Sequence, residues 1–169
     1  MKEPEIPITP AVRALRTAGV LFKAYFYTYK DRGGTHHAAE SLQVPEHEVV
    51  KTLVMESYEA SNKRSAFLIL MHGDCEVSTK QLARSLGVKT VAPASETTVS
   101  KCTGYVPGGV SPFGTRQRLQ VYVESTVMAL GRIYINGGKR GFLVEIDPAE
   151  LRKLLPITEV TAGLSSRPA

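Results

Sequence analysis

A lysine inside an apolar segment is the first residue of this sequence that could do chemistry. Lys51 lies within the apolar run 49–55, where the alternation of a strand places it on the same face as Leu53 and Met55. A lysine that points towards apolar surroundings is costly unless its ammonium group meets an anion or its stem reaches water. Two interpretations therefore stay open: Lys51 binds an anionic ligand, or it is an ordinary strand residue that reaches solvent.

Two glycine-rich turns, 104–114 and 136–141, are the second candidate. Glycines let backbone N–H groups converge on an anion without side chains in the way. Such a turn could hold a phosphate, or the oxyanion that develops when water attacks an ester. Lys139 and Arg140 would add positive charge for a nucleic-acid backbone, although a turn like the second one also closes ordinary hairpins. In the first turn, two prolines bracket Gly-Gly-x-Ser and make it stiff.

Other arrangements of catalytic residues are missing from the sequence. Ser111 lacks the G-x-S-x-G spacing of a nucleophile elbow and has no histidine near it in sequence, which argues against a serine hydrolase. The 4 histidines do not share the spacing of a helical zinc site, so we expect no metal. No phosphate-binding or dinucleotide-binding glycine motif occurs, and we expect no cofactor. Cys75 and Cys102 are too few for a disulfide framework and are expected to be reduced.

Composition limits the class of protein. With 169 residues, 43% of them hydrophobic, the chain fits one ordinary domain. The formal net charge of +5 favours an anionic partner such as nucleic acid. No apolar run approaches the ~20 residues that span a bilayer, and the amino terminus does not resemble a signal peptide. We therefore expect a cytoplasmic protein that does not bind membranes.

Hydrophobic periodicity and capping residues predict the elements that must position these candidates. Helices are expected at 9–19, 36–42, 78–87, after Ser95, and at 147–155. Strands are expected at 22–29, 49–55, 66–71, 119–124, 132–136 and 141–146. Since helices and strands do not alternate regularly, the sequence predicts an α+β domain. Its sheet should be mixed, mostly antiparallel and barrel-like, with short helices flanking it.

The ends of the chain are expected to lie outside the core. The first ten residues contain three prolines without an apolar period, which predicts a flexible arm over residues 1–8. The ordered domain is expected to cover 9–158. Residues 159–169 are expected to form a flexible tail, because its last part is small and polar.

Several short motifs occur in an order that is specific to a known family. They are Thr9-Pro10-Ala11-Val12, Val50-Lys51-Thr52-Leu53, Thr103-Gly104-Tyr105, 108–114 and 137–141. Through them the chain resembles the YbaK and prolyl-tRNA synthetase-associated editing domains, from Thr9 to about Leu155. The resemblance implies a compact α+β domain with a pocket that takes the acylated 3′ end of tRNA and hydrolyses the wrong amino acid from it.

The resemblance also implies how such a protein works. Members act as free proteins or as an insertion in the synthetase, and a chain of this length resembles the free, trans-acting type. Prolyl-tRNA synthetase is the partner that could provide selectivity for one tRNA. An aminoacyl ester is already activated, so positioning and an oxyanion site can suffice without a catalytic triad. A non-catalytic tRNA- or synthetase-binding module of the same fold stays open as the alternative.

The resemblance assigns roles to individual residues. Lys51 would engage the terminal adenosine phosphate or the ester carbonyl, and the backbone of Gly108 and Gly109 would stabilise the oxyanion. The expected substrate-binding residues are Tyr27, Thr52, Val110, Ser111, Pro112, Asn136, Gly137, Gly138, Lys139 and Arg140.

Two departures from the family pattern concern the substrate. Gly33-Gly34-Thr35 replaces an aromatic residue of the cysteine-specific branch, and Leu143 stands where that branch has an acidic residue, with only Glu145 nearby. Both argue against cysteine specificity, while Tyr27 is retained. The resemblance as a whole implies Cys-tRNA(Pro) or another small amino acid on tRNA(Pro) as the substrate, and these departures leave the choice between them open.

Overall fold

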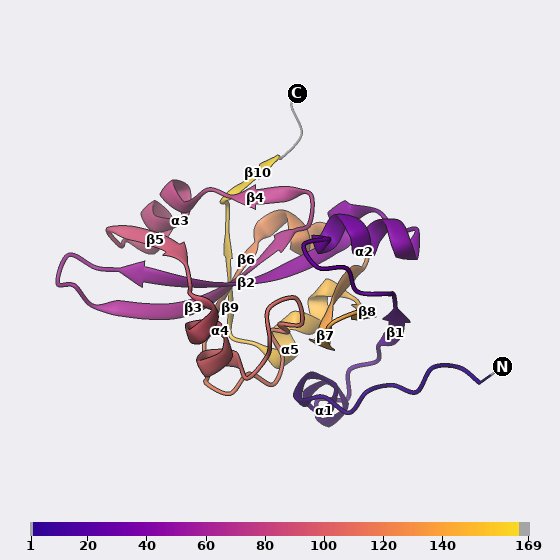
Figure 1. Cartoon of the computed structure of the whole chain (residues 1–169). Coiled ribbons are helices and arrows are strands. Elements are labelled where there is room, and N and C mark those ends of the chain that lie inside the picture. The colour runs from indigo at the N-terminus through magenta and orange to yellow at the C-terminus, as the bar shows by residue number, and fades with distance from the viewer. Residues whose placement is uncertain (1, 166–169) are drawn as a thin grey trace.

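The computed structural model of the chain describes residues 2–165 and shows one α+β unit (Figure 1). Its main sheet has eight strands. The order is β1-β8-β7-β2-β3-β6-β9, and β5 pairs with β2 beside this path. Strands β4 and β10 form a separate two-stranded sheet. The α+β class and the mixed sheet flanked by short helices are thus confirmed.

The strands are β1 (Lys23–Phe26), β2 (Val49–Tyr58), β3 (Arg64–His72), β4 (Cys75–Val77), β5 (Thr90–Pro93), β6 (Gln120–Glu124), β7 (Ile133–Lys139), β8 (Phe142–Ile146), β9 (Ile157–Val160) and β10 (Gly163–Ser165). The α-helices are α1 (Pro10–Thr17), α2 (Gly34–Leu42), α3 (Thr79–Leu86), α4 (Glu96–Thr103) and α5 (Leu151–Leu154). Three short 3₁₀ helices are η1 (Glu46–Glu48), η2 (Ser125–Ala129) and η3 (Pro148–Glu150). Within this described part, no helix is long and apolar enough to cross a membrane.

Three predicted helices begin at the residues that the capping pattern indicated. The side-chain oxygens of Thr9, Ser78 and Ser95 each accept the backbone N–H of the third residue further on. Helices α3 and α4 end at Gly87 and Gly104, both in the left-handed conformation. Local sequence therefore determines these helix ends.

Strand β2 divides its side chains between the two faces of the sheet. Val50 points into the main core, which α1, β6, β7 and β8 also form. On the other face, Val49 packs in a cluster under α2, whereas Leu53 and Met55 pack in a cluster under α3. By strand alternation Lys51 lies on this second face, between the two clusters.

One edge of β2 is shared by two different strands. Val49 and Val50 pair with β7 in parallel register. Met55 begins the antiparallel register with β5, which continues to Tyr58. The sheet therefore forks along β2, and Lys51 lies between the two branches.

The structure corrects the flexible tail that was expected over 159–169. Strand β9 pairs with β6, and β10 pairs with β4, so the chain is ordered through Ser165. Between these strands Ala162 is fully buried, and its N–H donates to the buried carboxylate of Glu124 at 2.8 Å. This contact fixes a segment whose own sequence is small and polar. The rest of the expected tail lies outside the described residues.

Other boundaries also differ from the expectation. The strand expected over 22–29 is shorter, because β1 ends at Phe26 and the chain then leaves the sheet. The helix expected over 147–155 is divided between η3 and α5. The expected arm 1–8 has no helix or strand in its described part, but Ile6 packs against the main core.

Thr9 links α1 to the second glycine-rich turn, which yields a stability prediction. Its hydroxyl caps α1 and donates to the carbonyl oxygen of Gly137 at 2.6 Å in a buried position. Thr9→Val keeps the shape but loses both interactions, so we expect the free energy of unfolding to fall by about 2 kcal/mol or more. Ser78→Ala removes only a cap and should cost about 1 kcal/mol. Urea unfolding measures both. Equal losses would show that the bond to Gly137 adds no stability.

Candidate active site

A cavity of about 430 Å³ opens between α2, the first half of β2 and the two glycine-rich turns. Six of the thirteen residues that the sequence proposed for the site line it: Tyr27, Lys51, Thr52, Gly108, Val110 and Asn136. They come from segments that are far apart in the chain. The fold therefore brings the proposed lysine and the first glycine-rich turn to one place.

Lys51 is half-buried and borders this cavity. Within residues 2–165, no carboxylate forms an ion pair with it. Two further cations, Lys30 and Arg32, lie on the same lining with exposed side chains. The cavity wall thus carries positive charge at the mouth and at β2, which suits an anionic ligand.

The side chain of Asn136 ties the two glycine-rich turns together. Its Nδ2 donates to the carbonyl oxygen of Gly108 at 3.2 Å. Its Oδ1 accepts the N–H of Gly138 at 2.7 Å and that of Lys139 at 3.1 Å. One amide therefore shapes the second turn and positions the first.

Arg140 and Tyr29 also contact the first glycine-rich turn, at the place where the two turns meet. Arg140 Nε donates to the carbonyl oxygen of Pro107 at 2.8 Å, and its guanidinium group lies 4.9 Å from the centre of the Tyr29 ring. Gly108 has φ +86°, and a Cβ there would lie 2.7 Å from the Tyr29 hydroxyl. A side chain at this position would be strained and would collide, so the close approach requires glycine.

The loop amides differ in whether they are available to a ligand. The N–H of Gly109 donates to the carbonyl oxygen of Val106 at 2.9 Å and closes a tight turn. This hydrogen bond argues against Gly109 as a donor to the substrate. The N–H groups of Gly108 and Val110 make no hydrogen bond within the described chain, and both residues line the cavity. They are the amides left for an oxyanion.

Seven of the proposed residues support the site without lining it. Ser111 is fully buried and its Oγ accepts the N–H of Phe113 at 3.2 Å, so it does not face the substrate. Gly137 packs against the Phe142 ring, where a Cβ would lie 2.3 Å from a ring carbon. The others are Gly109, Pro112, Gly138, Lys139 and Arg140, of which Lys139 and Arg140 are exposed.

The Thr52 hydroxyl is a buried polar group beside the cavity. Its oxygen is buried and has no hydrogen-bond partner in the part of the chain that the structure describes. A buried hydroxyl left without a partner costs about 1–3 kcal/mol. Strand alternation places this side chain on the face of β2 opposite Lys51.

The remaining wall is aromatic and apolar. Tyr27 packs edge-on against His37, with ring centres 5.9 Å apart, and burial raises the pKa of its hydroxyl. Ala38 and Leu143 are buried and complete this side. Sequence reasoning missed Tyr29, His37 and Ala38 as lining residues, although Tyr29 lies two residues beyond Tyr27 in a segment predicted to be extended.

Comparison with known proteins identifies the family. The sequence profile of the aminoacyl-tRNA editing domain matches residues 33–154. The chain belongs to this family. The match confirms the resemblance that the motifs indicated.

Individual relatives agree with this assignment. The editing domain is 29% identical over 147 residues to an Enterococcus faecalis protein named "Putative Cys-tRNA(Pro)/Cys-tRNA(Cys) deacylase EbsC", over 86% of this chain and 87% of the relative. It is 25% identical over 118 residues to the proline–tRNA ligase of Limosilactobacillus fermentum, over 68% of this chain and only 21% of the ligase. A crystal structure described as "a putative trans-editing enzyme for prolyl tRNA synthetase" has a TM-score of 0.78 at 22% identity, over 94% of this chain and 100% of that one. This last match shows a shared fold.

In this editing domain, Tyr105 lies near the start of the first glycine-rich turn and bonds to a residue near the end of the same turn. Its buried hydroxyl donates to the carbonyl oxygen of Phe113 at 2.6 Å. We expect Tyr105→Phe to lower the free energy of unfolding by about 1–3 kcal/mol, because that carbonyl loses its buried donor. Tyr122→Phe is the control, since the Tyr122 ring packs on Phe67 away from the turn, and it should cost much less. Urea unfolding compares the two variants. Equal losses would contradict the anchoring role.

The pH dependence of the free energy of unfolding tests whether the Tyr105 hydroxyl is buried in the folded protein. Burial raises the pKa of Tyr105 to about 12, whereas an unfolded tyrosine ionises near 10. The resulting stability is present in full below about pH 10 and is lost as the pH rises towards 12. The Tyr105→Phe protein should therefore lose less stability than the wild type over this interval. Both proteins keep Tyr134, whose pKa is also raised to about 12, so the difference isolates Tyr105.

Proposed function

We propose that this chain is a trans-acting aminoacyl-tRNA deacylase, which hydrolyses the ester of mischarged tRNA that carries a small amino acid. The observation that carries the proposal is the placement of Lys51 in one cavity with the free amides of Gly108 and Val110. A cation and two N–H donors on one cavity can bind a phosphate and stabilise an oxyanion.

The relatives support tRNA for proline as the substrate. EbsC is named for Cys-tRNA(Pro) and Cys-tRNA(Cys), and the ligase relative is specific for proline by name. The match spans only 21% of the length of that ligase, so this chain corresponds to about a fifth of it. A separate protein with the fold of a synthetase segment would act on tRNA that the synthetase has released, with prolyl-tRNA synthetase as its expected partner.

The mechanism follows from the groups on the cavity wall. The 3′-terminal adenosine of the tRNA enters at the mouth, where Lys30 and Arg32 offset the charge of its phosphates. Lys51 engages the terminal phosphate or the ester carbonyl. Water attacks the carbonyl carbon, and the amides of Gly108 and Val110 bind the oxyanion. The ester C–O bond then breaks, releasing the amino acid and a free ribose hydroxyl on the tRNA.

The apolar wall favours a small, uncharged amino acid side chain. Leu143 and Ala38 offer no hydrogen bond or charge to a substrate side chain, and Tyr27 keeps its proton because burial raises its pKa. On β2 the polar groups that border the cavity are the Lys51 ammonium group and the Thr52 hydroxyl, whose oxygen is buried. One methylene in such a pocket discriminates by about 1–3 kcal/mol, so alanine, cysteine and serine esters are the panel to compare.

Replacement of Lys51 tests the proposal. We expect Lys51→Ala to reduce kcat/KM for release of labelled amino acid from Cys-tRNA(Pro) or Ala-tRNA(Pro) by about 10²-fold or more. Lys89→Ala is the matched control, because Lys89 is exposed and lies outside this cavity, and its activity should equal the wild type. The ester that the wild type hydrolyses faster identifies the preferred amino acid.

A wild-type protein that binds these tRNAs but hydrolyses no ester in a wider aminoacyl-tRNA panel would contradict the deacylase. That result would favour the non-catalytic binding module. Full activity of Lys51→Ala would refute the proposed role of the lysine, but it would not by itself contradict the deacylase activity.

Gly108 offers a second test that changes no charge. In Gly108→Ala the new methyl group would meet the Tyr29 hydroxyl and displace the loop, which should lower kcat/KM by about 10²-fold. Gly131→Ala is the control, since a Cβ at Gly131 would meet no atom within 4 Å. Circular dichroism establishes that both variants fold. Wild-type activity in Gly108→Ala would rule out a need for this loop conformation.

A further inference from the structure

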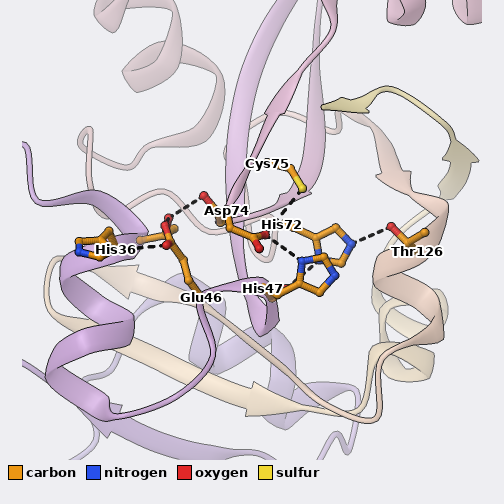
Figure 2. Close-up of polar contacts among 9 residues, drawn as sticks. His36, Glu46, His47, His72, Asp74, Cys75 and Thr126 are labelled. Atoms are coloured by element: carbon orange, nitrogen blue, oxygen red, sulfur yellow. Dashed lines mark hydrogen bonds and ion pairs between the residues drawn. The ribbon is translucent and has the colours of Figure 1, made fainter. Parts of the chain in front are cut away.

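A second cluster of reactive side chains lies where η1 meets the turn between β3 and β4 (Figure 2). It comprises His47, His72, Asp74 and Cys75, none of which lines the cavity of the proposed active site. Neither the family nor the proposed reaction assigns these residues a role. Figure 2 shows the side chains of His47 and Cys75 converging on the Asp74 carboxylate.

Three different donor atoms gather in this cluster. His47 Nδ1 lies 2.8 Å from Asp74 Oδ1, and Cys75 Sγ lies 3.6 Å from the same oxygen. The ligand atoms of all three residues lie within 4.8 Å of one another. A tetrahedral zinc ion would separate its oxygen and sulfur ligands by about 3.6 Å and its nitrogen and oxygen ligands by about 3.4 Å. The Asp74–Cys75 separation already fits, and the His47–Asp74 pair would open by about 0.6 Å.

A buried histidine fixes the ring of His47. His72 is 1% exposed, and its ring stacks on that of His47 with centres 3.7 Å apart and an interplanar angle of 6°. His72 Nδ1 lies 2.7 Å from the carbonyl oxygen of His47, which can only accept, so this nitrogen carries the proton. His72 Nε2 then accepts the hydroxyl hydrogen of Thr126 at 2.7 Å. His72 therefore holds both the backbone and the ring plane of His47 in place.

The turn that carries the other two donors is equally constrained. Gly73 donates its N–H to the carbonyl oxygen of Val49 at 2.7 Å and accepts the Thr35 hydroxyl at 3.1 Å. A Cβ at Gly73 would lie 2.7 Å from the Thr35 oxygen, so the turn packs tightly against α2. Asp74 and Cys75 follow directly and start from a fixed backbone.

We propose that His47, Asp74 and Cys75 bind a divalent transition-metal ion, with zinc the ion that the donors fit best. One nitrogen, one oxygen and one sulfur ligand suit zinc, whereas magnesium and calcium require mostly oxygen ligands. The thiolate and the carboxylate together balance the charge of the ion. A fourth position stays open to water.

Binding requires protons to leave the ligand atoms. Zinc binds the thiolate form of cysteine, so the Cys75 thiol gives up its proton. Metal binding replaces the S–H bond by a metal–sulfur bond and releases that proton to solvent. The Asp74 carboxylate accepts a hydrogen bond from His47 Nδ1, so the proton on this nitrogen must also leave it when Nδ1 binds the ion. No oxidation or reduction is involved.

Cobalt(II) titration of the full chain tests the site without any deacylation assay. We expect one ion per chain, visible bands of a tetrahedral cobalt centre, and a near-ultraviolet sulfur-to-cobalt band, all abolished by added zinc. Cys75→Ser should remove the near-ultraviolet band, and His47→Gln should weaken binding at least about tenfold. His36→Gln is the control, because His36 is an exposed histidine that contacts Glu40 and Glu46 instead, and it should bind as the wild type does.

Thermal unfolding in chelator establishes that each variant is folded before titration. Zinc should then raise the Tm of the wild type and of His36→Gln but not of His47→Gln. Three results would each overturn the proposal: no cobalt binding by the wild type, an unchanged spectrum in Cys75→Ser, or an equal loss of affinity in His36→Gln.

Discussion

The side-chain amide of Asn136 is the interaction on which the proposed active site depends. The register between β7 and β8 shifts between Asn136 and Lys139, which removes Gly137 and Gly138 from the regular ladder. The Asn136 side chain replaces the missing ladder partners by accepting two backbone N–H groups, and it donates to the first turn. A β-bulge in one hairpin thereby positions a loop that lies almost thirty residues away in sequence.

Packing beneath the turns makes this junction rigid. The second turn packs on Phe142, Tyr105 and Thr9, which fill the space beside Gly137 and Gly138. Thr9 and Tyr105 also bond the carbonyl oxygens of Gly137 and Phe113. The glycines therefore serve close packing on their inner side and expose backbone on their outer side, so the loops are not flexible linkers.

Sequence reasoning succeeded where the determining contacts are local. Helix caps such as Ser78 and the hairpin of β2 and β3 follow from residues a few positions apart, and the family motifs indicated Lys51 and Gly108. Strands β4, β5, β9 and β10 have three or four residues each, and distant partners stabilise them, so no periodicity indicated them.

The finer geometry of the site needed the structure as well. The turn that occupies the Gly109 amide and the burial of Ser111 depend on the path of the loop. The donors His47 and Asp74 are separated by 27 positions, and the return of β3 beside β2 brings them together. Histidine spacing alone had indicated that the chain has no metal site, because it tests only donors on one helix.

The fork in the main sheet has a consequence for what the cavity presents. Pairing with β7 stops at Val50 and pairing with β5 starts at Met55, so the stretch of β2 that contains Lys51 and Thr52 has no neighbouring strand on that edge. Lys51, Thr52 and Leu53 of this stretch all border the cavity. A ligand with its own amine and carbonyl can continue the ladder along this edge in place of a strand. Recognition of this kind would depend on the polypeptide backbone more than on the identity of the side chains.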